Sequence, residues 1–199
     1  MRIRTWLGDA AVALVLSIPA VGLAGAIPYG PGPLAHYTVR KQPAAGSCHY
    51  RYTSSKQPLP DRRCTPGARN PKVKPSTLAT TICKPGYTAR IRPPSSVTAA
   101  EKRANAVSYH YRGPLTQAEY DHLIPLELGG DPNDPRNLWV EPPSPGHKGS
   151  QGFRNPKDSV ERKAKSLVCN GRVPLAVMQR AIAVNWATAL AAVGHPTGK

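Results

Sequence analysis

An acidic residue and a histidine stand side by side at Asp121-His122, and an asparagine follows at Asn137. Histidine is the side chain whose ordinary pKa lies near neutrality, so His122 can take a proton from a nucleophile. Asp121 offers the hard oxygen that Mg²⁺ prefers, and the Asn137 amide can orient the imidazole and fix a loop. A base beside a cation ligand is what cleavage of a phosphodiester bond needs.

A second cation ligand is expected near the start of a helix that follows this run. Asn155 and Asp158 would supply an amide oxygen and a carboxylate, and His147 lies in the preceding Pro/Gly-rich loop. Asn155 and Asp158 are also residues that begin helices without any catalytic role, so the three stay open as alternatives. The residues assigned to the predicted site are, for catalysis, His122 and Asn137 and, for the metal, Asp121, Asn155 and Asp158.

Several motifs around these residues resemble the HNH family of metal-dependent endonucleases, whose fold is also called ββα-metal. They are Asp-His-Leu-Ile-Pro-Leu-Glu-Leu-Gly-Gly from Asp121, Asn-Leu-Trp-Val-Glu-Pro from Asn137 and Lys-Asp-x-Val-Glu from Lys157. The resemblance implies that His122 activates water, that Asp121 holds a divalent cation, and that Asn137 braces the loop. Mg²⁺ is the first choice of cation, with Mn²⁺ or Zn²⁺ as alternatives. The third motif departs from the family pattern, because there is no His-x-x-x-His or Cys-x-x-Cys-His.

The elements that would position these residues follow from the same part of the chain. The run from Tyr120 predicts a strand, a loop and a second strand. Residues 156–168 predict a helix with Asn155 at its cap and a proline at its first position. The predicted fold class is therefore α+β, with a ββα-metal (HNH) core at about residues 118–169 and flanking helices.

The segments around this core differ in composition. Residues 27–95 are rich in Pro, Gly, Ser and Thr, which argues against long helices. We expect a mobile tail over residues 27–47 and a strand over residues 87–92, where basic and aromatic side chains alternate. Helices are predicted over residues 96–108 and from Pro174 onward. The predicted divisions are a signal peptide at 1–26, a Pro-rich, disulfide-pinned arm at 27–95 and an HNH nuclease-like domain at 96–199.

Basic residues dominate the composition. Lys and Arg number 27 against 11 Asp and Glu, a formal net charge of +16. This excess favours polyanionic partners, above all DNA or RNA, with a solvated basic surface as the alternative. The candidates for phosphate contacts on the predicted helix are Lys157, Arg162 and Lys165. The chain has no Gly-rich phosphate loop, no Gly-x-Ser-x-Gly and no His-Glu-x-x-His, which counts against a P-loop protein, a serine hydrolase and a zincin protease.

The N-terminus has the pattern of an export signal. Arg2 and Arg4 precede an apolar run at residues 10–24, and Ala-Gly-Ala at residues 24–26 is a small-residue cleavage site. We therefore expect a secreted protein without a stable membrane span, with an uncleaved anchor as the alternative.

Cysteine usage agrees with export. The four cysteines are an even number, which predicts two disulfides in an exported chain. Of the three possible pairings we favour Cys48–Cys64, which closes a local loop, together with Cys83–Cys169, which ties the N-terminal segment to the end of the predicted helix. The alternative is free cysteines in a reducing compartment.

These features lead to the hypothesis of a secreted, metal-dependent endonuclease that hydrolyses phosphodiester bonds of DNA, with RNA as the other possible substrate. The alternative is a non-catalytic basic protein that binds nucleic acid or an envelope polymer and carries a degenerate HNH site.

Overall fold

The computed structural model describes residues 26–146 and 155–196. The predicted signal peptide, apart from its last residue, and the candidate ligand His147 lie outside the described residues. The strands are β1 (Arg51–Tyr52), β2 (Pro58–Leu59), β3 (Glu119–His122) and β4 (Leu138–Glu141). The helices are α1 (Tyr87–Ile91), α2 (Ser95–Ser108), α3 (Pro156–Cys169), α4 (Leu175–Asn185) and α5 (Ala189–Ala192). Short 3-10 turns are η1 (Pro75–Thr80), η2 (Leu115–Gln117), η3 (Leu126–Leu128) and η5 (Trp186–Thr188). The protein is mixed α+β, as predicted.

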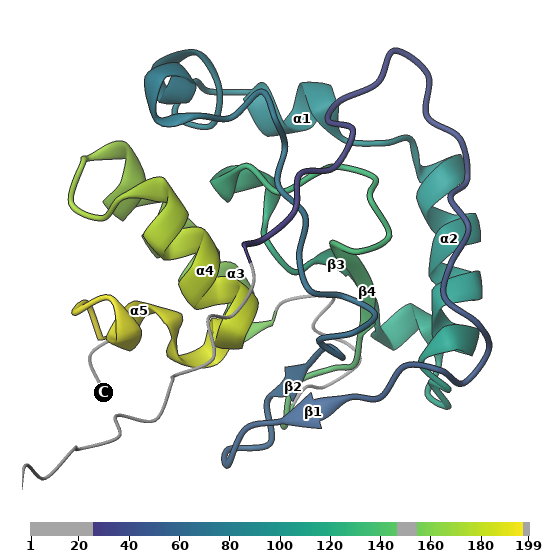
Figure 1. Cartoon of the computed structure of the whole chain (residues 1–199). Helices are drawn as coiled ribbons and strands as arrows, with labels where there is room; N and C mark the ends of the chain where they lie inside the picture. Colours follow the sequence, from purple (N-terminus) through teal and green to yellow (C-terminus); the bar gives the residue numbers. More distant parts are fainter. Residues whose placement is uncertain (1–25, 147–154, 197–199) are drawn as a thin grey trace, which may run out of the picture.

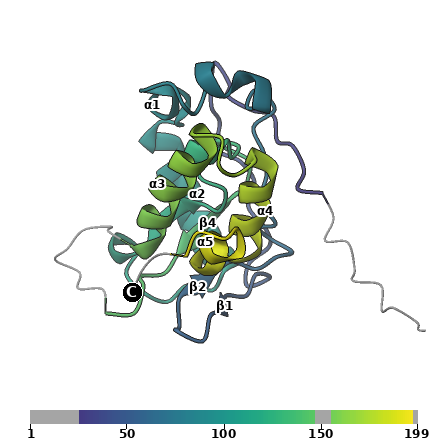
Figure 2. The same ribbon diagram turned by 90° about the vertical axis from the view of Figure 1, so that its left-hand side faces the viewer.

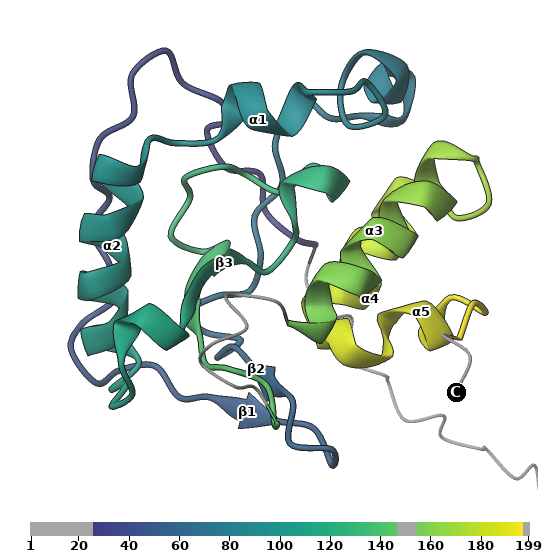
Figure 3. The same ribbon diagram turned by 180° about the vertical axis from the view of Figure 1, so that it is seen from behind.

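Strands β3 and β4 form an antiparallel pair at the centre of the molecule. Helix α2 covers one side of this pair and the helices α3 to α5 lie on the other, as Figure 1 and the opposite view in Figure 3 both show. In register, Glu119 lies opposite Glu141 and Asp121 lies opposite Trp139. Because successive side chains of a strand point to opposite faces, these four share one face and His122 belongs to the other.

The main core lies between α3, α4, α5 and the segment that precedes α2. Met178, Ile182 and Trp186 are spaced four residues apart and are almost fully buried. Figure 2, in which α4 and α5 face the viewer, shows the three C-terminal helices packed as one group. By length and composition the run Leu175–Ala192 could cross a membrane, but the core helix of a globular protein passes the same test, and this run contributes its apolar face to the core.

Segment 27–95 contributes residues to this core. Its residues Leu59, Val73 and Ile82 are buried in the same cluster as α3 and α4. The tail expected to be mobile is also attached, since the backbone of Gly30 donates to the carbonyl of Arg69 at 2.9 Å. Hydrogen bonds between distant parts of the chain hold it along the protein, and composition alone does not reveal them.

The prediction of a strand over residues 87–92 is wrong, because this segment forms helix α1. Tyr87 and Ile91 lie one helical turn apart and are both buried, so the core selects the helical spacing over the alternation of basic and aromatic residues. Gly86 begins the helix in the left-handed conformation, with φ 75°. Arg92 is extended, as expected of a residue before a proline, and the helix ends there.

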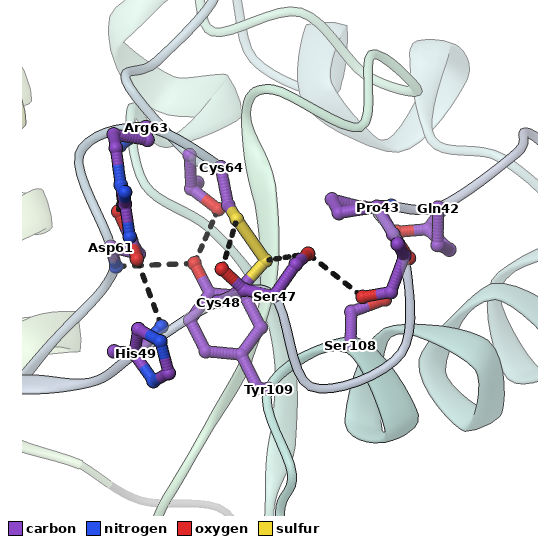
Figure 4. Close-up of a disulfide and its surroundings, with 12 residues drawn as sticks. Gln42, Pro43, Ser47, Cys48, His49, Asp61, Arg63, Cys64, Ser108 and Tyr109 are labelled. Atoms are coloured by element: carbon purple, nitrogen blue, oxygen red, sulfur yellow. Dashed lines mark hydrogen bonds and ion pairs between the residues drawn. A yellow bond between two sulfur atoms is a disulfide. The ribbon is translucent and has the colours of Figure 1, made fainter.

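Both favoured disulfides are present. Cys48–Cys64 closes a local loop, and Cys83–Cys169 joins the segment before α1 to the last residue of α3. Around the first disulfide, Figure 4 shows Asp61 accepting hydrogen bonds from the backbone N–H groups of its neighbours in the loop. The donors are His49 at 2.9 Å and Arg63 at 2.7 Å. This disulfide therefore closes a loop that is also ordered by a buried carboxylate.

Candidate functional site

The loop between β3 and β4 is organised by the fully buried amide of Asn137. Its Oδ1 accepts from the backbone N–H of Ile124 at 3.0 Å and, more weakly, from that of Ala68 at 3.4 Å. Its Nδ2 donates to the carbonyls of Ile124 and Asp131, both at 3.0 Å. A side chain on Gly130 would collide with the Ile124 carbonyl, so the loop needs glycine where its backbone passes closest. Asn137 thus connects both ends of the loop that begins directly after His122.

His122 is the last residue of β3 and is only 6% exposed. Its Nε2 lies 3.0 Å from the carbonyl oxygen of Pro132. Burial lowers the pKa of His122 to about 4, and the positive charge of Arg92 adds to this effect. The imidazole is therefore neutral at neutral pH. Because a carbonyl only accepts, the proton of this neutral ring is assigned to Nε2, and Nδ1 is left with a lone pair.

Asp121 lies on the opposite face of β3, where it meets the first turn of α3. The ammonium of Lys157 lies 2.6 Å from Asp121 Oδ2 and 2.9 Å from the carbonyl oxygen of His122. The same ammonium contacts Glu161 Oε1, one turn further along α3. The indole Nε1 of Trp139 donates to Asp121 Oδ2 at 3.3 Å. The Asp121 carboxylate is thus held by a lysine and a tryptophan and does not converge with the imidazole.

Three further carboxyl groups surround this ion pair. Burial, and then the charge of Asp121, raise the pKa of Glu119 to about 8 and raise that of Glu141 well above its ordinary value. Burial raises the pKa of Glu161 to about 7, although Lys157 opposes the shift. Repulsion between acids in a buried place favours their neutral forms. At neutral pH the cluster therefore carries far less negative charge than its composition suggests.

Two of the metal ligands predicted from the sequence, Asp121 and Asn155, are already engaged with other groups of the protein. Asn155 caps α3, because its Oδ1 accepts from the backbone N–H of Lys157 at 2.8 Å, and its Nδ2 donates to Glu119 at 3.0 Å. Asp158 is half-buried in the first turn of α3. Over residues 26–146 and 155–196, no group of three or more His, Cys, Asp or Glu side chains is placed to hold a metal ion. As these side chains lie, with Lys157 on Asp121, they do not fit a divalent cation.

The three predicted phosphate contacts have different surroundings. Lys157 is 1% exposed and fully engaged with the protein, so it cannot reach a phosphate as it lies here. Arg162 is exposed, and Lys165 lies 3.9 Å from Glu127. Phosphate contacts by Arg162 and Lys165 stay predictions.

Sequence reasoning missed two features of the site. Arg92 is exposed and close enough to influence the pKa of His122, but it belongs to a segment that was predicted as a strand. The cluster of acidic side chains around Lys157 was also missed. The sequence does indicate it: Glu119 and Asp121 are two residues apart, so they share one face of a strand, and Lys157 and Glu161 are an i, i+4 pair on a helix.

Comparisons of the chain with family models, with curated proteins and with solved structures found no match. The resemblance to HNH endonucleases therefore rests on the motifs of the sequence and on the order of strand, strand and helix around them.

Proposed function

We propose that this protein cleaves phosphodiester bonds of nucleic acid, with His122 as the proton acceptor. One observation supports this most directly. His122 is neutral, its Nε2–H is directed to the Pro132 carbonyl, and its Nδ1 therefore has a lone pair in a fixed orientation. A general base needs this combination of protonation state and orientation. The two disulfides suit the exported protein that this proposal assumes.

In the proposed reaction, Nδ1 of His122 takes the proton of the attacking hydroxyl, which is water for DNA, and water or the 2′-hydroxyl for RNA. The attacking oxygen forms a new bond to phosphorus while the bond from phosphorus to the leaving sugar oxygen breaks, and that oxygen takes its proton from solvent water. Arg92 supplies positive charge close enough to lower the pKa of the imidazole, and a guanidinium binds phosphate oxygens well. The negative charge of a bound phosphate favours the protonated imidazole, so substrate raises the pKa of His122 from its low value. Substrate binding would thus strengthen the base at the moment when it is needed.

The proposed proton transfer to His122 uses no divalent cation, because the Lys157 ammonium already holds Asp121 Oδ2 at 2.6 Å. Mg²⁺ dependence stays a prediction of the family resemblance, and a comparison of activity with and without EDTA tests it.

The variant His122→Gln tests the proposal. Its amide can still donate to the Pro132 carbonyl but cannot act as a base near neutral pH. We expect cleavage of supercoiled plasmid and of a single-stranded RNA to fall by about 100-fold or more. The matched control is His36→Ala, an exposed histidine that should cleave like the parent protein. Circular dichroism and thermal unfolding would show that both variants keep the fold. A folded His122→Gln protein with undiminished cleavage would refute the role of His122.

A second candidate function is binding without cleavage, and one observation favours it. The imidazole and the Asp121 carboxylate occupy opposite faces of β3, and the ring is largely covered. A basic protein with such a site would still retain nucleic acid, with affinity falling steeply as salt rises. Salt-dependent retention of DNA or RNA, with no cleavage in Mg²⁺, Mn²⁺ or EDTA, would select this alternative. Stronger retention of an anionic envelope polymer at matched salt would identify that class of partner instead.

A further inference from the structure

A buried lysine is the most unusual feature of the acidic face of β3. Lys157 is 1% exposed, although lysine is among the residues least often fully buried. Removing an ammonium from water is costly unless oxygen atoms replace the water molecules that it loses. The surroundings of Lys157 therefore have to provide that replacement.

Three oxygens surround the ammonium, one for each of its protons. They are Asp121 Oδ2 at 2.6 Å, the His122 carbonyl oxygen at 2.9 Å and Glu161 Oε1. We call these three atoms the oxygen cage. Two carboxylates and a carbonyl are also the kind of oxygen set that a hard divalent cation prefers. The cage is therefore a cation site by its chemistry, and its cation is a side chain of the same protein.

The backbone fixes the ammonium in this cage. Lys157 lies in the first turn of α3, where the Asn155 cap bonds its backbone N–H at 2.8 Å. Displacing the ammonium would leave the buried Asp121 carboxylate without its counter-ion.

We propose that Lys157 is the resident cation of this site, and that its ammonium excludes a divalent cation from Asp121. This inference deepens the proposed function, and what it says about cleavage rests on that function. The cage itself can be tested without measuring cleavage. It assigns Lys157 a positioning role: the ammonium joins β3 to α3 and holds the backbone carbonyl of His122. It also makes the proposed cleavage independent of a metal at Asp121.

Terbium ions test the cage directly, because the indole of Trp139 lies beside it and would sensitise the emission of Tb³⁺ bound there. We expect the parent protein and Asp121→Asn to give the same Tb³⁺ emission, because Lys157 already excludes the ion from Asp121. Lys157→Ala removes the ammonium and frees Asp121 and Glu161, so we expect at least a tenfold gain in Tb³⁺ affinity. Adding Asp121→Asn to Lys157→Ala should abolish that gain. Lys163→Ala, which removes an exposed lysine from the same helix, is the matched control and should behave like the parent protein.

Two results would overturn the inference. One is Tb³⁺ or Mn²⁺ binding by the parent protein that Asp121→Asn removes. The other is a folded Lys157→Ala protein with no gain in affinity. If Lys157→Ala fails to fold, the comparison of the parent protein with Asp121→Asn still decides the question.

Cleavage assays separate this inference from the proposed function. Cleavage by the parent protein that persists in EDTA supports both. Cleavage that EDTA abolishes, together with Asp121-dependent Mn²⁺ binding, overturns the resident-cation inference and leaves the proposed function intact. Absence of cleavage under every condition refutes the proposed function, whereas the Tb³⁺ titration still decides the cage.

Discussion

Replacing Asn137 by alanine should destabilise the protein more than a single side-chain change usually does. The amide is fully buried and makes three hydrogen bonds of 3.0 Å, two with the backbone of Ile124 and one with the carbonyl of Asp131. Each buried hydrogen bond contributes about 1 kcal/mol net, and a stranded buried partner costs somewhat more, so the expected loss is roughly 3–4 kcal/mol. Typical domains unfold with about 5–15 kcal/mol, so this loss is a large fraction of the total.

Urea unfolding followed by tryptophan fluorescence would measure this loss, because Trp139 and Trp186 are both buried. The matched control is Asn170→Ala, an exposed asparagine at the end of α3 that should cost far less. Asn137→Asp refines the test: it keeps the acceptor for the Ile124 N–H but directs a carboxylate oxygen at two carbonyls. It should therefore be at least as damaging at neutral pH and recover partly in acid. A loss below about 1 kcal/mol in Asn137→Ala, at an unchanged urea dependence, would refute the bracing role derived from the hydrogen bonds.

Two further predictions concern stability. Replacing Cys83 and Cys169 by serine opens a loop with a sequence separation of 86 and should cost about 4.6 kcal/mol by loop entropy, against about 3.1 kcal/mol for Cys48 and Cys64 at a separation of 16. Urea midpoints of the two double variants check this order, and the reverse order would contradict it. The second prediction concerns Asp61: burial alone would raise the pKa of its carboxyl, but two backbone N–H donors hold that pKa below its ordinary value. The stability that Asp61 contributes is therefore fully present above the unfolded pKa of about 3.9 and is lost as pH falls through the folded pKa. Asp61→Asn should therefore be less stable than the parent protein at pH 7 and approach it in strong acid, and a stability gap that does not change with pH would refute this.

Local signals predicted the elements whose stability is mostly local. Helix α3 begins at Pro156 after the Asn155 cap, as the order of asparagine, proline and aspartate in the sequence indicates. The last helix also follows Pro174, as predicted, because α4 begins at Leu175. That helix is interrupted, however, at Asn185, whose extended φ of −163° separates α4 from η5. The Asn185 side chain accepts from the backbone N–H of Ala187 at 3.1 Å, and this side-chain bond to the backbone competes with the regular helix.

Long-range contacts decided what the sequence could not predict. Segment 27–47 has no periodic pattern, but the backbone of Arg40 donates to the fully buried Glu101 at 2.7 Å and Gly32 donates to Asp131 at 2.6 Å. The burial of Lys157 is another such case. A lysine in the first turn of a helix is normally solvated, and only the meeting of α3 with the acidic face of β3 makes burial favourable.

The alternation of β3 divides the polar groups of the candidate site into two sets that have different chemistry. Glu119 and Asp121 point to the face that Lys157 neutralises, whereas His122 points to the other. A base and an acid on opposite faces of a strand cannot act on one phosphate without breaking the β3–β4 pairing. Any chemistry in this arrangement therefore belongs to the face of His122. The acidic face acts on His122 through the backbone, because Lys157 holds the His122 carbonyl. The Pro132 carbonyl fixes the imidazole from the other side. If the site does cleave nucleic acid, charge changes on the acidic face should alter the orientation and the pKa of His122 more than they alter substrate binding.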